Sequence, residues 1–149
     1  MLEQEAVLAY PDFTQPFNLY TDARNYKLGA TLVQNGKPLG FYTSKLNDSQ
    51  MNYTVGEKEL LGIVEGFKAF KGILRGAITT VHTNHLNLLY RKLLSQRMVC
   101  WQSMLEEFEP SFKYISGEKN DAANALCRLE MEERLNNTIN WEVKHPKLE

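Results

Sequence analysis

The dipeptide Asn35-Gly36 constrains the fold most, because it joins two strand-like segments through a turn of two residues. Asparagine and glycine both tolerate the left-handed backbone that a tight β-hairpin turn requires. Residues 28–34 are the predicted strand before this turn, and residues 38–43 are the predicted strand after it. Residues 17–21 alternate in the manner of a further strand. The chain is therefore predicted to begin its fold with three antiparallel strands.

A long helix is predicted next, from Thr54 to near Gly76. Thr54 and Glu57 have the spacing of a capping box, in which each side chain satisfies a free backbone N–H at the start of a helix. Gly76 suits the end of the helix, because glycine adopts the left-handed conformation of a helix terminus. Apolar residues follow the cap at three- and four-residue steps, as in a helix packed on a core: Leu60, Leu61, Val64, Phe67 and Phe70.

Short strands and helices are predicted over the rest of the chain. The strands are residues 78–83 and 111–115, and the helices are residues 86–93, 96–108 and about 121–134. Within the second of these helices, Trp101, Met104, Leu105 and Phe108 have helical spacing and are predicted to be core residues. The order β-β-β-α-β-α-α-β-α predicts an α/β fold with a five-stranded mixed sheet flanked by helices.

Three sections of the chain are predicted: an irregular lead-in over residues 1–16, one domain over residues 17–134, and a flexible tail over residues 135–149. A length of 149 residues suits one ordinary domain. The net charge of −1 gives no overall field that attracts nucleic acid, so any such contact needs a local basic patch. Cys100 and Cys127 form no disulfide framework and no metal-like spacing.

No stretch is long and apolar enough to span a membrane, which takes about 20 residues, and the N-terminal residues lack the order of a signal peptide. We therefore expect an intracellular protein without a membrane partner.

Four polar residues fall where predicted strands end or predicted helices begin: Asp22, Glu59, Asn84 and Asn124. A fold gathers such positions at one edge of a sheet, so they are the candidate site. Carboxylates bind Mg²⁺ because hard cations prefer charged oxygen, whereas a side-chain amide offers a neutral carbonyl oxygen. Whether the site is catalytic therefore depends on Asn84 and Asn124.

Six segments carry a resemblance to one family: residues 10–13, 17–22, 28–33, 52–61, 80–83 and 121–129. Together they cover about residues 6–130 in the right order. The chain resembles the ribonuclease H domain of gypsy-type long-terminal-repeat retrotransposon polyproteins, where this domain follows the reverse transcriptase. The resemblance implies a ribonuclease H-like fold. It also implies that the lead-in, residues 1–16, is the end of the connection to the polymerase, and that the polymerase domain of the same polyprotein is a partner.

The resemblance further implies two-metal hydrolysis of the RNA strand of an RNA–DNA hybrid, with Mg²⁺ as the metal. Asp22 would bridge both ions and Glu59 would hold one of them. Asn84 and Asn124 stand where the family has aspartates. With two of four carboxylates replaced by amides, we expect hydrolysis to be lost or strongly reduced, although the similar shape of asparagine should preserve the fold. Two alternatives remain open, namely slow residual cleavage and a non-catalytic module that binds nucleic acid or plays a structural role.

Other polar residues have simpler interpretations. Glu57 is better explained as part of the capping box, and Asp121 as a helix N-cap, than as replacement ligands. His82 is expected to have an ordinary polar role. A basic group, Arg91, Lys92 and Arg97, could contact a nucleic-acid backbone or simply be a solvated helix surface.

Overall fold

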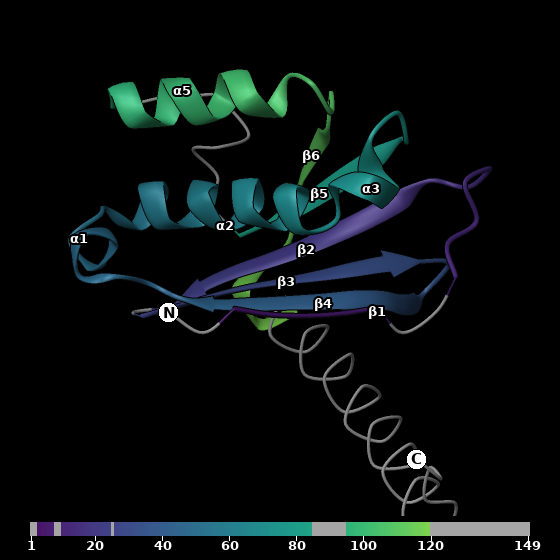
Figure 1. The fold of residues 1–149 in the computed structure, drawn as a ribbon, viewed down its shortest axis with the longest axis horizontal. Helices are drawn as coiled ribbons and strands as arrows, with labels where there is room; N and C mark the ends of the chain where they lie inside the picture. The colour runs from purple at the N-terminus through teal and green to yellow at the C-terminus, as the bar shows by residue number, and fades with distance from the viewer. Residues whose placement is uncertain (1–2, 8–9, 25, 85–94, 120–149) are drawn as a thin grey trace, which may run out of the picture.

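The computed structural model describes residues 3–7, 10–24, 26–84 and 95–119. Figure 1 shows a twisted sheet with its long helix, α2, lying across one face and a second helix, α5, lying over α2. The strands are β1 (Glu3–Val7), β2 (Phe17–Arg24), β3 (Lys27–Gln34), β4 (Lys37–Lys45), β5 (Thr79–Thr83) and β6 (Ser111–Tyr114). The helices are α1 (Asp48–Met51), α2 (Val55–Ala69), α3 (Lys71–Leu74) and α5 (Gln96–Leu105).

The strands lie in the order β1-β4-β3-β2-β5-β6. Strands β2, β3 and β4 pair antiparallel, and β5 lies parallel to both β2 and β6. The five predicted strands thus form the predicted mixed sheet. A sixth strand, β1, adds to the outer edge by pairing antiparallel with β4 from Glu3↔Ser44 to Val7↔Gly40. The prediction of an irregular lead-in over residues 1–16 did not include this strand.

The Asn35-Gly36 turn has the predicted hairpin geometry. Both residues have positive φ, 52° at Asn35 and 75° at Gly36, which is the combination that a type I′ turn requires. This turn sets the pairing of Gln34 with Lys37 and of Val33 with Pro38. The register then shifts between Leu32 and Val33, so the turn does not by itself decide the pairing of the rest of β3 and β4.

Helix α2 begins with the predicted capping box, since the Thr54 side chain accepts from the Glu57 N–H while the Glu57 side chain accepts from the Thr54 N–H. The prediction of one helix reaching Gly76 is wrong. Phe70 leaves the helical conformation at φ −107° and ψ 21°, and the short helix α3 follows. Gly76 itself does have the predicted positive φ, 78°.

The core fills the space between α2 and the sheet. Two glycines of α2 face the sheet, and one of them, Gly66, allows a close approach. A methyl group on Gly66 would lie 3.1 Å from the Ala30 Cβ and 3.3 Å from the Leu19 Cδ2, which is tighter than normal contact. On Gly62 it would lie 3.9 Å from the backbone oxygen of Asp22, an ordinary contact distance. The helix therefore rests directly on β2 and β3, and its first turns come to the end of β2.

Helix α5 covers α2 from outside through Met98 and Leu105, which are buried. Trp101 and Phe108, which were also predicted to be core residues, pack against the core but are only partly buried. Met104 is 44% exposed, so its prediction as a core residue is wrong. The helix ends at Leu105 rather than Phe108. The predicted helices over residues 86–93 and 121–134, and the predicted tail, lie outside the described residues.

Candidate functional site

Asp22 and Glu59 meet where the end of β2 passes under the first turns of α2. Both side chains are largely shielded from solvent, since the Asp22 side chain is 14% exposed and Glu59 as a residue is 6% exposed. Burial, and then the negative charge of Asp22, raises the pKa of the Glu59 carboxyl to about 8. The structure therefore brings together the two carboxylates among the four predicted site residues.

The Oε2 atom of Glu59 is buried without a hydrogen-bond partner among the described residues. A buried polar atom in this state costs free energy, because it has lost its hydration without replacing it. Near neutral pH, with no cation beside it, the carboxyl is mostly protonated because its pKa lies near 8. Such an oxygen suits a ligand that brings positive charge.

Asn84 lies at the same edge of the sheet as Asp22. The parallel register pairs Tyr20 of β2 with His82 of β5, and Asp22 and Asn84 each come two residues later in the same direction. The carboxyl ends of neighbouring parallel strands meet at one edge, which is where α/β folds place their sites. Asn84 is exposed, and a methyl group on Gly117 would lie 3.5 Å from its Nδ2, so the segment after β6 also reaches this edge.

The other predicted site residues lie outside the described part of the chain. They are Asn124, Arg91 and Lys92.

Arg24 contacts the candidate site and was not among the predicted site residues. Its Nε donates a hydrogen bond to the Asp22 Oδ2 over 2.8 Å, which is also an ion pair. The two residues are two positions apart on β2, so their side chains leave the same face of the strand. The Arg24 side chain is 63% exposed, and with Ala23, Val55 and Lys58 it lines an open cavity of about 350 Å³. The predicted strand ended at residue 21, before both residues, so the prediction did not place them on one face of a strand.

The donor set at this edge fits a divalent cation, but it is sparse. Asp22 and Glu59 supply carboxylate oxygens, one of them unpartnered, and the neighbouring Asn84 can supply a neutral oxygen. Magnesium is commonly held by one or two carboxylates plus water. Nowhere in the described ranges do three or more His, Cys, Asp or Glu side chains gather as a metal site would need. These residues therefore suit the binding of one ion better than the binding of two, because two ions require a dense cluster of carboxylates.

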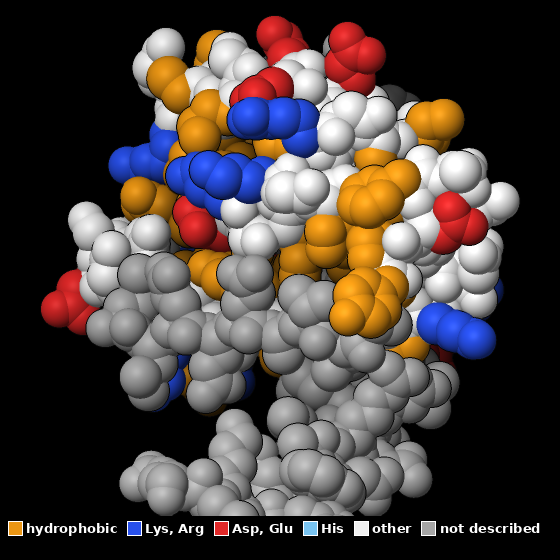
Figure 2. Space-filling view, turned by 45° about the vertical axis from the view of Figure 1, so that its right-hand side comes forward, with side chains coloured by type: hydrophobic (Ala, Val, Ile, Leu, Met, Phe, Trp, Pro, Cys, Tyr) orange, Lys and Arg blue, Asp and Glu red, His pale blue; other side chains and the backbone are white. Residues whose placement is uncertain are grey.

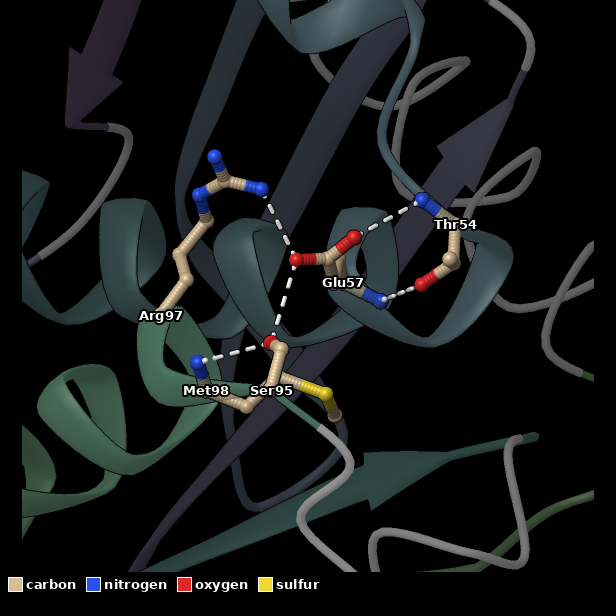
Figure 3. Close-up of polar contacts among 5 residues, drawn as sticks. All are labelled: Thr54, Glu57, Ser95, Arg97 and Met98. Atoms are coloured by element: carbon tan, nitrogen blue, oxygen red, sulfur yellow. Dashed lines mark hydrogen bonds and ion pairs between the residues drawn. The ribbon is translucent and has the colours of Figure 1, made fainter.

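Glu57 belongs to a separate polar cluster that ties the start of α2 to the start of α5 (Figure 3). One carboxylate oxygen, Oε1, accepts from the Thr54 N–H at 3.0 Å. The other, Oε2, accepts from the Ser95 hydroxyl at 3.1 Å and from the Arg97 Nη1 at 2.8 Å. Ser95 in turn caps α5 by accepting from the Met98 N–H. The interpretation of Glu57 as a capping residue is confirmed.

The same cluster includes Arg97, for which a nucleic-acid contact and a solvated helix surface were the two open interpretations. Its guanidinium pairs with Glu57 and lies over the Tyr53 ring, with Cζ 3.9 Å from the ring centre. The Arg97 side chain nevertheless remains 44% exposed. The Thr54 N–H, together with Arg97 and Ser95, lowers the pKa of the Glu57 carboxyl despite its burial.

His82 has the ordinary polar role that was predicted. Its Nε2 is 2.9 Å from the Asn18 Oδ1, and its ring stacks on Tyr20 with centroids 4.4 Å apart. Burial, and then the positive charge of Lys113, lowers the pKa of His82. A neutral imidazole can donate its Nε2 hydrogen to Asn18, so this contact joins β2 to β5 beside the candidate site.

On the face shown in Figure 2, most of the visible Lys and Arg side chains of the described residues lie close together at the upper left, next to acidic and hydrophobic side chains, and another lies apart at the right. Within the described residues, no helix is both long and apolar enough to cross a membrane.

Comparison with solved structures supports the fold. The chain superposes on LC11-RNase H1 in complex with RNA/DNA hybrid with a TM-score of 0.59 at 13% identity, covering 80% of this chain and 98% of that one. It superposes on the foamy viral protease-reverse transcriptase in complex with dsDNA with a TM-score of 0.60 at 22% identity, covering 74% of this chain and 25% of that one. At these identities the likeness shows a ribonuclease H-like fold alone.

Comparison with known sequences shows the family. Residues 12–108 match the model of the RNase H-like domain found in reverse transcriptase. The chain is 38% identical over 136 residues to the retrovirus-related Pol polyprotein from transposon 297 of Drosophila melanogaster, and 33% identical over 135 residues to the Tf2-3 polyprotein of Schizosaccharomyces pombe. These matches cover 89% and 83% of this chain but only 13% and 10% of the relatives. The chain therefore belongs to the family of RNase H-like domains found in the reverse transcriptases of retrotransposon polyproteins.

Proposed function

We propose that this chain is an RNase H domain whose metal-dependent cleavage of RNA in RNA–DNA hybrids is lost or strongly reduced. The observation that carries the proposal is the amide of Asn84 beside Asp22 at the edge of the sheet, where the family resemblance implies an aspartate. Asn124 is a second amide at an implied carboxylate position. Of the four implied charges, Asp22 and Glu59 remain.

The chemistry of the family explains why the amides matter. Magnesium, when bound, supplies an activated water and stabilises the leaving oxygen. The part of this chain is to hold and orient the metal through Asp22 and Glu59, while Asn84 offers only a neutral oxygen. Each lost carboxylate removes a charge that would act at short range in a partly shielded site. Glu59 must also release a proton before it can bind a cation, because its pKa lies near 8. All these effects weaken metal binding in the same direction.

The amide substitutions should not unfold the domain. Asparagine and aspartate have nearly the same shape, and a carboxylate at position 84 would add a negative charge near that of Asp22. Removing that charge relieves repulsion when no metal is bound. We therefore propose a folded domain with impaired catalysis rather than a misfolded relic.

Slow residual cleavage is the second candidate function. It is favoured by the unpartnered Oε2 of Glu59 next to Asp22, since these two carboxylates still suit one divalent cation. Under either candidate, the partners we propose are an RNA–DNA hybrid and the polymerase domain of the same polyprotein, with Mg²⁺ as the weakened cofactor.

The test uses the whole chain and a fluorescently labelled RNA–DNA hybrid. We expect a gel shift in EDTA that weakens as salt rises, because backbone contacts release counterions. We also expect no cleavage in Mg²⁺, and slow cleavage at most in Mn²⁺. Cleavage in Mg²⁺ at the rate of an active RNase H control would contradict the loss of catalysis. Binding no tighter than that of an unrelated acidic protein would contradict the hybrid as partner.

A further inference from the structure

We propose that Arg24 is an internal cation of the candidate site, which neutralises Asp22 in place of a divalent metal and competes with metal binding there. The proposal rests on the proposed function, because it takes Asp22 as a metal ligand. It concerns a residue that neither the sequence motifs nor the family resemblance singled out.

The geometry is direct. The Arg24 Nε lies 2.8 Å from the Asp22 Oδ2, the distance of a charge-assisted hydrogen bond. Asp22 is the carboxylate proposed to contact the metal, and its side chain is 14% exposed, so few positions around it are open to a cation. A metal that takes the Oδ2 atom must displace the guanidinium from it. The two cations therefore compete for one oxygen.

Charge adds to this competition. A guanidinium remains protonated throughout the pH range in which proteins fold, so its charge is a fixed feature of the site. With Arg24 in place, the pair of Asp22 and Arg24 is neutral, and Glu59 is the other carboxyl at the site. Two effects therefore oppose the binding of a divalent cation. Arg24 repels it at close range, and the amides at positions 84 and 124 no longer attract it as carboxylates would. Repulsion of this kind lowers metal affinity most at low ionic strength.

The local structure leaves room for the side chain of Arg24 to exchange partners. It is 63% exposed and lines the open cavity together with Lys58. Displacing the guanidinium from Asp22 therefore does not require the core to open. Competition at equilibrium, rather than a permanent block, is the expected behaviour.

The experiment measures Mn²⁺ affinity, by calorimetry or by water-proton relaxation, in the Asn84→Asp variant with and without Arg24→Gln. We expect Arg24→Gln to tighten Mn²⁺ binding at least about threefold at low ionic strength, and we expect the difference to shrink as salt rises. Arg24→Lys keeps the charge and should bind Mn²⁺ within about twofold of the parent, since a lysine can also pair with Asp22.

Arg75→Gln is the matched control. Arg75 is 64% exposed and pairs with Glu107, so the variant makes the same change in net charge and breaks a similar surface ion pair elsewhere. An Mn²⁺ affinity that Arg24→Gln leaves unchanged, or an equal gain from Arg75→Gln, would overturn the proposal and leave the proposed function standing. Absence of Mn²⁺ binding in every variant would also overturn the proposal about Arg24, because no metal site would exist for it to oppose, but it would agree with the loss of cleavage. The proposed function is overturned instead by cleavage of the hybrid in Mg²⁺ at the rate of an active RNase H control.

Discussion

Gly66 of α2 lies so close to Ala30 of β3 that a methyl group on the glycine would come within 3.1 Å of the Ala30 Cβ. It would also come within 3.3 Å of Leu19. We predict that Gly66→Ala destabilises the domain by about 1–3 kcal/mol, because overpacking a core outweighs the better helix propensity of alanine. Urea denaturation in EDTA measures this change in the free energy of unfolding.

Gly62→Ala is the natural control for this prediction. At Gly62 the added methyl meets Leu28 at 3.8 Å and the Asp22 backbone at 3.9 Å, both ordinary contacts. Alanine then gains helix propensity without a clash, so the variant should be neutral or up to about 1 kcal/mol more stable. If both variants destabilise equally, the close approach at Gly66 is not what limits the packing of α2.

Glu57 and Arg97 should show energetic coupling. We predict that Glu57→Gln and Arg97→Gln each destabilise the domain, and that a double-mutant cycle gives a coupling free energy of about 0.5–1 kcal/mol. The pair is partly shielded, with the Glu57 side chain 9% exposed and that of Arg97 44% exposed. The pair Lys68 and Glu65, more exposed and 3.7 Å apart, should give a smaller coupling and serves as the comparison.

The contribution of Glu57 should also depend on pH in a defined direction. Its pKa is lowered, first by the Thr54 backbone N–H, so the folded state favours the ionised form. The stabilisation is therefore present above the pKa of the unfolded chain and is lost as pH falls through the folded pKa. The stability difference between the parent and Glu57→Gln should shrink on acidification. A difference that grows instead would contradict the assigned contacts.

Glu59 should behave in the opposite way. Its pKa is raised to about 8 from an ordinary value of 4.5, so the folded state holds the proton more tightly than the unfolded chain does. In EDTA, stability should fall as pH rises between these values, by about 1.4 kcal/mol for each unit of pKa difference. Glu59→Gln removes this fall in stability, because glutamine does not titrate. Its stabilising effect, measured by urea denaturation, should be larger at about pH 8 than at about pH 5. An effect independent of pH would contradict the burial of Glu59 beside Asp22.

The pKa of His82 should respond to Lys113. Residue His82 of β5 pairs with Lys113 of β6, and the positive charge of the lysine is the second cause, after burial, of the lowered histidine pKa. We predict that Lys113→Gln raises the pKa of His82 toward its usual value, as followed by NMR titration of the ring. Lys68→Gln, which changes a surface charge on α2, should leave it unaltered.

Local signals predicted much of the fold. The Asn35-Gly36 turn and the Thr54–Glu57 capping box each involve residues within three positions of one another, so short-range rules suffice. Strand β1 escaped prediction because it forms by pairing with β4, a contact between distant parts of the chain. The end of α2 at Phe70 was also missed, because Gly76 was a visible stop signal whereas nothing in the helical pattern marked Phe70.

The candidate site was predicted in part for a similar reason. Motif positions identified Asp22, Glu59 and Asn84, which lie at the strand and helix ends that the fold gathers. The ion pair of Arg24 with Asp22 was missed because the predicted strand ended at residue 21, whereas β2 continues to Arg24 and places both side chains on one face. The contacts of Ser95 and Arg97 with Glu57 join two helices, and only their packing brings those residues together.

The central claim is that amides in place of carboxylates limit catalysis by this domain. The most direct measurement compares RNA–DNA hybrid cleavage in Mg²⁺ by the unmodified chain and by the Asn84→Asp/Asn124→Asp variant. We predict that the restored variant cleaves at least about a hundredfold faster, which corresponds to about 2.7 kcal/mol in the activation free energy. Equal rates for the two proteins would contradict the claim.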